Sequence, residues 1–253
     1  MTAAHNIVLD MGNVLMTFDG MYFSRIFTDS EEDAKALYDG LYGRTEWALL
    51  DAGAIDHETM LRVAEAHTPE RLLPNLHECL AHWPEHSQVI EGTNELARRL
   101  KAAGWGVYVL SNASTRIHEQ LDRAPAAAFA DGVVVSALER IMKPDPAIFS
   151  LLCERYGLEP ATCIFVDDNL DNCAGAAAAG MRPFEQFRIC KEVLDSCRRN
   201  ESIRGLVKGF MVESYLEDGN QPVDGGVYGK SITDACIGWD KTEYLIRELA
   251  ERA

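Results

Sequence analysis

Short apolar runs that stop on polar residues recur along the first two thirds of the chain. The first, Ile7 to Leu9, is followed by Asp10 and then by the turn-compatible residues Gly12 and Asn13. An apolar run of this length, bounded by turn residues, predicts a buried parallel strand with a loop at its carboxyl end. In open α/β sheets, ligands bind at that end of the strands. The pattern therefore predicts a strand and, beside it, a candidate site.

Helical patterns separate this run from later ones. Further strands are predicted over residues 106–110, 132–135 and 163–166. Helices are predicted over residues 89–103, 115–121, 146–156 and 172–179, and glycine follows three of them as an end signal. Strands that alternate with helices predict an α/β fold with a doubly wound parallel sheet.

The stretch between the first two predicted strands has a different pattern. Aromatic and aliphatic residues recur at helical spacing from Tyr22 to Leu50, and few β-branched runs occur. Asp56 with Thr59 predicts a helix start, and residues 57–67 continue as a helix. We therefore expect an all-helical insertion here.

The pattern changes again from about residue 189. Residues 191–199 and 241–252 have helical patterns, and an apolar strand is predicted over residues 206–212. A glycine-rich loop covers residues 218–229. This part does not continue the alternation of strand and helix, so we expect it to be a separate segment.

Composition limits the classes of partner. The chain has 253 residues, 47% of them hydrophobic, and a formal net charge of −16. Phosphates of nucleic acid and anionic membrane surfaces would repel such a chain, so we expect neither as a partner. Seven cysteines without a Cys-x-x-Cys pair predict reduced thiols in a cytoplasmic protein. We recognise no signal peptide and no long apolar span.

The polar residues after the apolar runs are the candidates for chemistry. Asp10 follows the first run, Ser111 and Asn112 end the second, and Asp167 and Asp168 follow the last. A carboxylate at such a position is a metal ligand, a nucleophile or a helix N-cap, and a cap is the default for one aspartate alone. Two adjacent carboxylates, however, repel each other unless a cation lies nearby.

Lys143 lies in a loop punctuated by Pro144 and Pro146. Most lysines are surface residues, and that is the alternative to a functional role. The order and spacing of Asp10, Ser111, Lys143 and the aspartate pair resemble the haloacid dehalogenase-like hydrolase superfamily over residues 5–187. Residues 10–14 and 165–172 are similar to its sugar-phosphatase-like members. The resemblance implies a catalytic core from residues 1–17 and 87–188 and a helical cap from residues 18–86.

The resemblance also implies phosphoryl-transfer chemistry on a small phosphorylated metabolite, such as a sugar phosphate. Asp10 would attack phosphorus and form an aspartyl-phosphate that water hydrolyses, while Lys143 neutralises phosphate charge and holds Asp10. Ser111 and Asn112 would bind phosphate oxygens. Mg²⁺ prefers oxygen ligands, and the expected ones are Asp10, the backbone carbonyl of Gly12 and Asp168. Asp167 would either bind the ion directly or lie next to the residues that do.

One residue departs from this family pattern. Most phosphatases of the superfamily carry an aspartate as general acid and base where this chain has Gly12, and glycine cannot transfer a proton. Two alternatives to the phosphatase therefore stay open. One is a 2-haloacid dehalogenase, which also lacks that aspartate but works without metal. The other is a non-catalytic binding or regulatory protein.

Residues 189–253 resemble the C-terminal end of type I 3-deoxy-arabino-heptulosonate-7-phosphate synthases. The matching phrases cover residues 211–214, 217–221 and 228–239. In that family, Glu213 and Asp234 match two ligands of a divalent metal, whose other ligands come from earlier parts of the barrel. A fragment of about two strands cannot close a barrel. We therefore expect no synthase activity, and we expect this segment to pack on the rest of the chain, to be poorly ordered, or to dock to another chain.

Overall fold

The structure is a computed structural model. It describes residues 5–181, 198–199, 201, 204, 207, 212–217, 219–222, 225–232, 236–239, 242–243, 246–247 and 250. The chain divides into two compact units, Met1–Pro183 and Phe184–Ala253. The sheet and all helices given below belong to the first unit.

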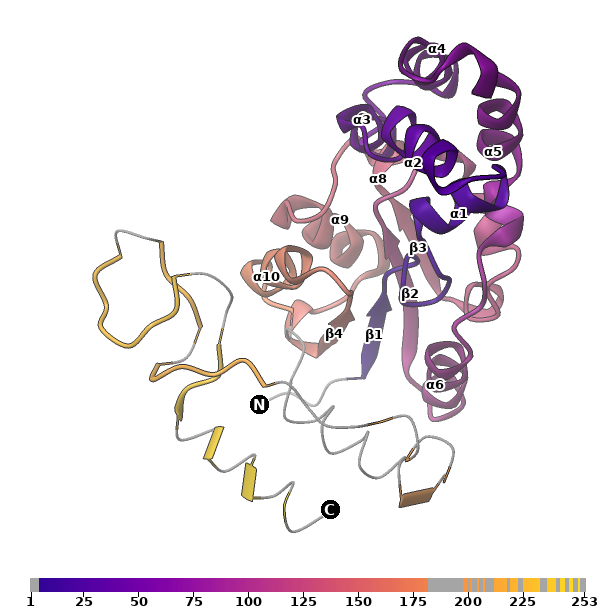
Figure 1. Ribbon diagram of the computed structural model, residues 1–253. Coiled ribbons are helices and arrows are strands. Elements are labelled where there is room, and N and C mark those ends of the chain that lie inside the picture. The colour runs from indigo at the N-terminus through magenta and orange to yellow at the C-terminus, as the bar shows by residue number, and fades with distance from the viewer. Residues whose placement is uncertain are drawn as a thin grey trace. The chain divides into compact units, whose positions relative to one another are not determined.

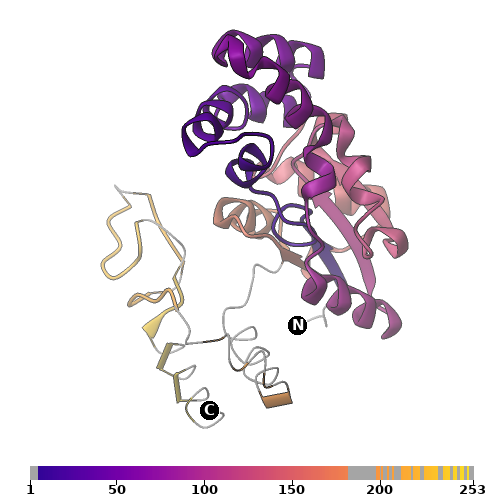
Figure 2. The same ribbon diagram turned by 45° about the vertical axis from the view of Figure 1, so that its right-hand side comes forward.

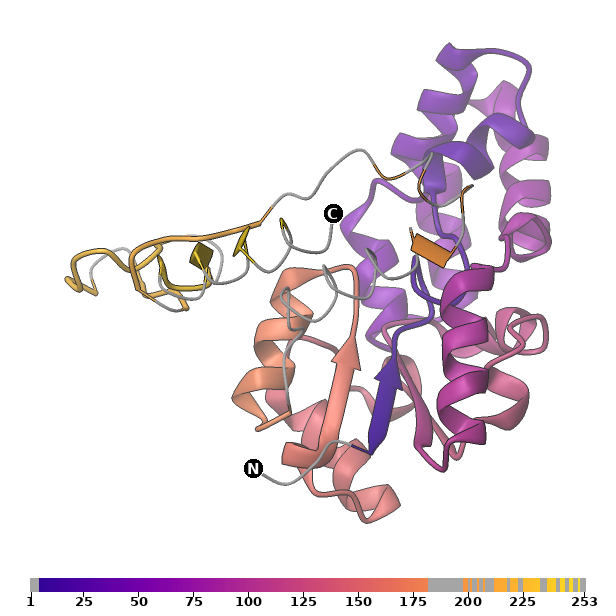
Figure 3. The same cartoon turned by 90° about the horizontal axis from the view of Figure 1, so that it is seen from below.

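Four parallel strands form one sheet in the order β3-β2-β1-β4 (Figure 1). They are β1 (Asn6–Leu9), β2 (Gly106–Ser111), β3 (Gly132–Val135) and β4 (Cys163–Val166). All four strands predicted from the apolar runs are confirmed, and the bounds of β3 and β4 agree to the residue. Figure 3 shows β1 and β4 side by side and pointing the same way.

Alternate residues of the strands pack on opposite faces of the sheet. Ile7 and Leu9 join a core that includes Ala97 of α6 (Glu91–Ala102). Val8 joins a core that includes Phe149 of α9 (Pro146–Tyr156) and Ala176 of α10 (Leu170–Ala178). Burial on both faces explains why the strands are apolar throughout rather than alternating with polar residues. The doubly wound parallel architecture is therefore confirmed, with α6 on one side of the sheet and α9 and α10 on the other (Figure 1).

The helices agree with the periodicity in kind, with small shifts at their ends. They are α1 (Gly20–Ile26), α2 (Glu31–Gly40), α3 (Thr45–Asp51), α4 (His57–His67), α5 (Leu73–His86), α6 (Glu91–Ala102), α7 (His118–Leu121), α8 (Ser136–Glu139), α9 (Pro146–Tyr156) and α10 (Leu170–Ala178), with 3₁₀ turns η1 (Glu70–Leu72), η2 (Thr115–Ile117), η3 (Ala127–Phe129) and η4 (Pro160–Thr162). The predicted helix over residues 115–121 is split between η2 and α7. The four-residue α8 was not predicted, because one helical turn is too short to show a period.

Helices α1–α5, the helical segment of residues 20–86, follow β1 as expected. The Asp56 side chain accepts a hydrogen bond of 2.8 Å from the backbone N–H of Thr59, which confirms the predicted start of α4. The segment has its own core, in which Phe23, Leu37 and Met60 are fully buried. Figures 1 and 2 show these helices beyond the carboxyl ends of the strands.

The chain enters and leaves the helical segment at one place. The backbone N–H of Thr17 donates to the carbonyl of Gln88 at 2.8 Å, and the N–H of Gln88 donates to the Thr17 hydroxyl at 2.9 Å. The Ser87 hydroxyl donates to the carbonyl of Thr17 at 2.6 Å. The two crossings are therefore hydrogen-bonded to each other.

A second connection joins the end of α3 to the sheet. The Ser136 hydroxyl, directly after β3, donates to the carbonyl of Asp51 at 2.5 Å. Gly53 has a φ of +68°, and a Cβ at this position would collide with the backbone carbonyl of Ala137. Glycine therefore satisfies two separate requirements here, a left-handed backbone and a close approach to α8.

The second unit is described only in part. Within it, Ser214 forms a parallel bridge to Ile237, and Gly219 forms an antiparallel bridge to Cys236. The predictions for residues 191–199, 206–212 and 241–252 fall largely outside the described residues, and Asp234 lies outside them. Within the described part of the chain, no helix is long and apolar enough to cross a membrane.

We predict that Gly53→Ala destabilises the protein far more than Gly157→Ala. Gly157 has nearly the same φ, +65°, but a Cβ there would meet nothing within 4 Å. Gly157→Ala should therefore cost only the left-handed backbone penalty of about 1–2 kcal/mol. Gly53→Ala adds a collision with backbone, so its total should be about 3 kcal/mol or more. Urea denaturation measures both, and equal losses would contradict the packing described for Gly53.

Candidate active site

The carboxyl ends of three strands bring the predicted site residues together. Asp10 follows β1, Ser111 ends β2, and Asp168 follows β4 by one residue. All three line one pocket of about 280 Å³, together with Gly12 and Asn112. Parallel strands present their carboxyl ends at one edge, which is why residues more than 150 positions apart meet there.

Lys143 lies under this edge and is fully buried. Its ammonium group is 2.8 Å from Asp10 Oδ1 and 2.6 Å from Asp167 Oδ2, and it donates to the carbonyl of Leu110 at 3.0 Å. Three oxygens thus surround the three N–H donors of the lysine, which is the arrangement that makes a buried ammonium tolerable. The surface-lysine alternative is therefore wrong.

Asn112 places Lys143 through its backbone. Its amide donates to the carbonyl of Lys143 and accepts from the N–H of Lys143, both at 2.8 Å. Both the Nδ2 and the Oδ1 of Asn112 are therefore engaged with the backbone of Lys143, although the residue also lines the pocket. Its predicted contact with phosphate stays a prediction.

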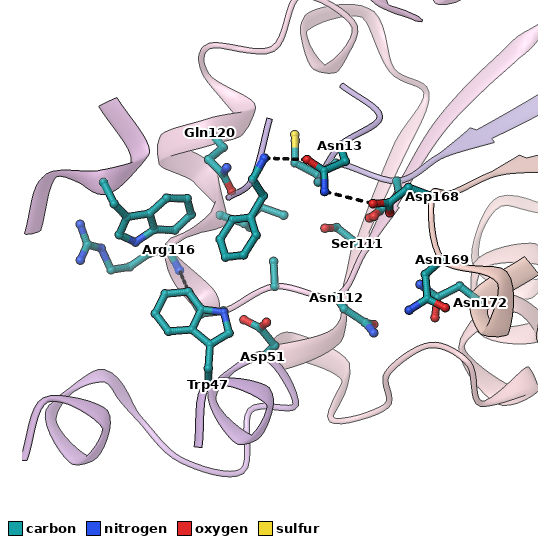
Figure 4. Close-up of a pocket in the computed structure, with 18 residues that line it drawn as sticks. Asn13, Trp47, Asp51, Ser111, Asn112, Arg116, Gln120, Asp168, Asn169 and Asn172 are labelled. Carbon is teal, nitrogen blue, oxygen red and sulfur yellow. Dashed lines mark hydrogen bonds between the residues drawn. The ribbon is translucent and has the colours of Figure 1, made fainter. Parts of the chain in front are cut away.

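The two adjacent aspartates have different surroundings. Asp167 is buried, and its carboxylate accepts hydrogen bonds from Lys143 Nζ, from Asn172 Nδ2 and from the backbone N–H of Asn169. Asp168 is exposed and accepts from Asn13 Nδ2 at 3.0 Å. Asp167 is held within the protein, whereas Asp168 faces the pocket (Figure 4).

These carboxylates could hold a divalent metal ion. One oxygen each of Asp10, Asp167 and Asp168 lies within 4.8 Å of the others. Burial raises the pKa of Asp10, the Lys143 ammonium opposes this, and the charge of Asp167 raises it further. Three carboxylates face one ammonium, so a hard cation with oxygen ligands fits both the charge and the donor atoms.

The backbone of the loop after β1 explains the asparagine of its Gly-Asn sequence. Asn13 has a φ of +53°, which asparagine tolerates better than most residues, and its Oδ1 accepts from the N–H of Phe18 at 2.9 Å. A Cβ at Gly12 would meet only ordinary contacts of 3.7 Å or more. Steric crowding at Cβ therefore does not explain the glycine.

A family model for haloacid dehalogenase-like hydrolases matches residues 5–180. The chain belongs to this family. Among solved structures, a family enzyme from Bacteroides thetaiotaomicron, an Asp-to-Ala mutant complexed with magnesium and inorganic phosphate, covers 72% of this chain and 93% of its own, with a TM-score of 0.57 and 18% identity. L-2-haloacid dehalogenase from Xanthobacter autotrophicus, with chloropropionic acid covalently bound, covers 70% of this chain and 75% of its own, with a TM-score of 0.51 and 18% identity. At these identities the two hydrolase structures show a shared fold.

The resemblance to heptulosonate-phosphate synthases is also confirmed, for a fragment. Phe-sensitive phospho-2-dehydro-3-deoxyheptonate aldolase of Escherichia coli K12 is 45% identical over 69 residues, which is 26% of this chain and 19% of that enzyme. The Trp-sensitive enzyme of Enterobacter agglomerans is 56% identical over 69 residues. This chain therefore spans about a fifth of the length of these relatives.

The hydrolase pocket has a second wall, which comes from the helical segment and from Phe18 just before it. Phe18, Trp47 and Trp83 line it, with Phe18 and Trp83 edge to face at 5.3 Å between ring centroids. Arg116 also lines the pocket, but its guanidinium is engaged by Glu119 and by the carbonyls of Leu80 and Ala81. One wall is therefore aromatic, and the opposite side is polar.

Asp51, the last residue of α3, was missed by the sequence analysis. It is half-buried, lines the same pocket, and points its carboxylate into the cavity beside Trp47 (Figure 4). Burial raises the pKa of Asp51 to about 7. A hydrogen bond from the Ser114 backbone acts in the opposite direction and lowers the pKa, whereas the negative charge of Asp10 raises it further. The only sequence signal was its place in the phrase from Trp47 to Asp56, two residues before the turn glycine Gly53.

We predict that Asp51→Asn stabilises the protein increasingly as pH rises from about 4 to about 7. The folded-state pKa lies above the unfolded value of 3.8, so the wild-type protein loses stability as pH rises between the two values. The difference should grow by on the order of 1 kcal/mol per pH unit. Thermal denaturation at a series of pH values measures it. The exposed Asp122, changed to Asn, is the control, and an Asp51→Asn difference that stays constant with pH would refute the environment described for Asp51.

Proposed function

We propose that this chain is a Mg²⁺-dependent phosphatase that hydrolyses a small phosphorylated metabolite through an aspartyl-phosphate on Asp10. The observation that carries the proposal is the Asp10 carboxylate, which lines the pocket beside Asp168 while Lys143 holds it from below. A nucleophile, a cation site and a fixed positive charge are the parts that phosphoryl transfer requires.

Each residue has a separate task in this proposal. Asp10 attacks phosphorus, and Lys143 fixes Asp10 and offsets the charge that gathers at the site. Ser111 and backbone N–H groups beside it bind phosphate oxygens. Asp10, Asp168 and the Gly12 carbonyl would hold Mg²⁺. Asp167 would lie next to these ligands, paired with Lys143. The ion would offset the repulsion between the carboxylate and the phosphate.

The pocket favours a small substrate. Its volume of about 280 Å³ suits a small metabolite. Trp47 and Trp83 line the pocket and offer flat apolar faces on which a sugar ring can stack. We further propose that residues 18–86 are the cap that closes over this substrate.

A 2-haloacid dehalogenase is the second candidate. Gly12 favours it, because a dehalogenase needs no proton donor at this position. The three-carboxylate group of Asp10, Asp167 and Asp168 favours the phosphatase, because it suits a divalent cation that a metal-independent enzyme does not need. A non-catalytic binding protein is the third candidate.

We predict phosphate release from phosphorylated metabolites in Mg²⁺ and its loss on chelation. Asp10→Asn should abolish turnover by removing the nucleophile. Asp168→Ala should abolish it by removing a cation ligand that Asp167 cannot replace. Lys143→Ala should also be severe, because it leaves two buried carboxylates without their partner. A phosphate-release assay over a panel of phosphate esters measures all three.

The controls separate the candidates. Asp171→Asn changes an exposed carboxylate nearby, in the first turn of α10, and should retain activity. Phosphate release that persists in chelator would overturn the metal-dependent mechanism. Chloride release from 2-chloropropionate without metal would favour the dehalogenase, and turnover of no substrate by any variant would favour the binding protein.

We propose that residues 189–253 are a fused fragment without synthase activity, and that they dock to another chain. The synthase relatives are matched over only 19% of their length. Two carboxylates, Glu213 and Asp234, are a poor transition-metal site without the softer ligands that the rest of a synthase supplies.

We predict that the purified protein forms no heptulosonate phosphate from phosphoenolpyruvate and erythrose 4-phosphate, with Mn²⁺ present. A chain ending after Arg188 should keep its phosphatase activity, because every residue proposed for that reaction precedes residue 169. Condensation activity would overturn the first expectation. Loss of phosphatase activity in a soluble truncated chain would overturn the second.

A further inference from the structure

The proposed reaction lacks a proton donor where the phosphatases that the chain resembles have one. Gly12 has no side chain, and the amide of its neighbour Asn13 is occupied by the N–H of Phe18 and by Asp168. Alkoxide is a poor leaving group, so an alkyl phosphate needs an acid near the oxygen that departs. The acid has to come from another part of the pocket.

Among the described residues that line this pocket, three carry carboxylates: Asp10, Asp168 and Asp51. Asp10 is the proposed nucleophile and Asp168 a proposed cation ligand. Asp51 is not part of the three-carboxylate group. It is therefore the one carboxylate in this lining without an assigned task.

The position of Asp51 is fixed from the sheet. The Ser136 hydroxyl donates to the Asp51 carbonyl at 2.5 Å, and it accepts from the N–H of Ala113 at 2.9 Å, so one hydroxyl joins the end of α3 to the loop after β2. Gly53 allows the chain to turn directly against α8. Asp51 is therefore part of the helical segment in sequence, but its backbone is held by a residue at the edge of the sheet.

The surroundings of Asp51 keep its proton available near neutral pH. Burial and the charge of Asp10 raise its pKa, and the hydrogen bond from Ser114 only partly offsets them. The charged residues around this pocket are Asp10 after β1, Asp168 after β4 and Arg116 of η2. The Arg116 guanidinium is engaged by Glu119 and by two carbonyls of α5. Its pairing with Glu119 limits the charge it can offer Asp51.

We propose that Asp51 is the general acid and base of the reaction at Asp10. This inference rests on the proposed phosphatase function. In the first step the Asp10 carboxylate forms a bond to phosphorus while the ester P–O bond breaks. The departing oxygen takes the proton of the Asp51 carboxyl group and leaves as an alcohol. In the second step water gives a proton to the Asp51 carboxylate and its oxygen bonds to phosphorus, which breaks the bond to Asp10 and releases phosphate.

The test compares two leaving groups in the full-length protein. One substrate is the alkyl phosphate turned over fastest in the screen above, and the other is p-nitrophenyl phosphate, whose phenolate departs without a proton. Asp51→Asn keeps the shape and should lower kcat for the alkyl ester by about 10²–10⁴-fold. With the aryl ester it should give a burst of about one p-nitrophenol per site at the wild-type rate, then slow turnover with phosphate trapped on Asp10.

A pH profile and a conservative variant complete the test. Wild-type kcat/KM for the alkyl ester should fall as pH rises through about 7, because the first step needs the protonated acid, and Asp51→Asn should lose this limb. Asp51→Glu should recover part of the alkyl-ester rate.

Three outcomes would overturn the proposal: unchanged rates in Asp51→Asn, an equal loss in the burst phase and in alkyl-ester hydrolysis, or recovery of no activity by Asp51→Glu. A wild-type protein that hydrolyses neither ester, or carries no phosphate on Asp10, would instead overturn the phosphatase function itself.

Discussion

The ammonium group of Lys143 lies in the protein interior, between the carboxylates of Asp10 and Asp167. Removal of Lys143 would leave two carboxylates without their cation at a place where water cannot compensate for them. The triad joins the end of β1 to the end of β4, and the amide of Asn112 extends it to β2. Local rules of helix and strand formation would allow these loops many conformations. The need to surround one buried cation with oxygen selects the conformation in which Asp10 faces the pocket.

The site combines a rigid edge with residues from a separate segment. The sheet edge supplies the carboxylates of Asp10 and Asp168, and the helical segment supplies the aromatic wall and Asp51. This division explains how a chain with glycine at position 12 can still place an acid in the pocket. The helical segment brings Asp51 into the pocket that the nucleophile Asp10 also lines, so the acid and the nucleophile come from separate parts of the chain. Chemistry and substrate selection would then depend on the same few helices.

Much of this arrangement could be predicted from sequence, because the strands are buried on both faces and end on polar residues. Asp10, Ser111 and Asp168 were placed correctly at one edge by that logic alone. Lys143 required the family resemblance, since nothing local separates a buried lysine from a surface one. Asp51 could not be found, because its position depends on contacts of Ser136 and Gly53 with residues far away in sequence. The two hydrogen bonds between the Asn112 side chain and the Lys143 backbone could not be predicted for the same reason, because they join residues that are distant in sequence.

The hydrogen bonds between Thr17 and residues 87–88 have a consequence for how the chain folds. Pairing of β1 with β2 would otherwise close a loop of about a hundred residues, and the entropy lost on closure grows with loop length. The helical segment has a core of its own, and its two ends lie side by side. Once that core has formed, only about thirty residues separate β1 from β2 along the shortest path. A pairing of high contact order thereby becomes nearly local, which favours rapid assembly of the sheet on which the site depends.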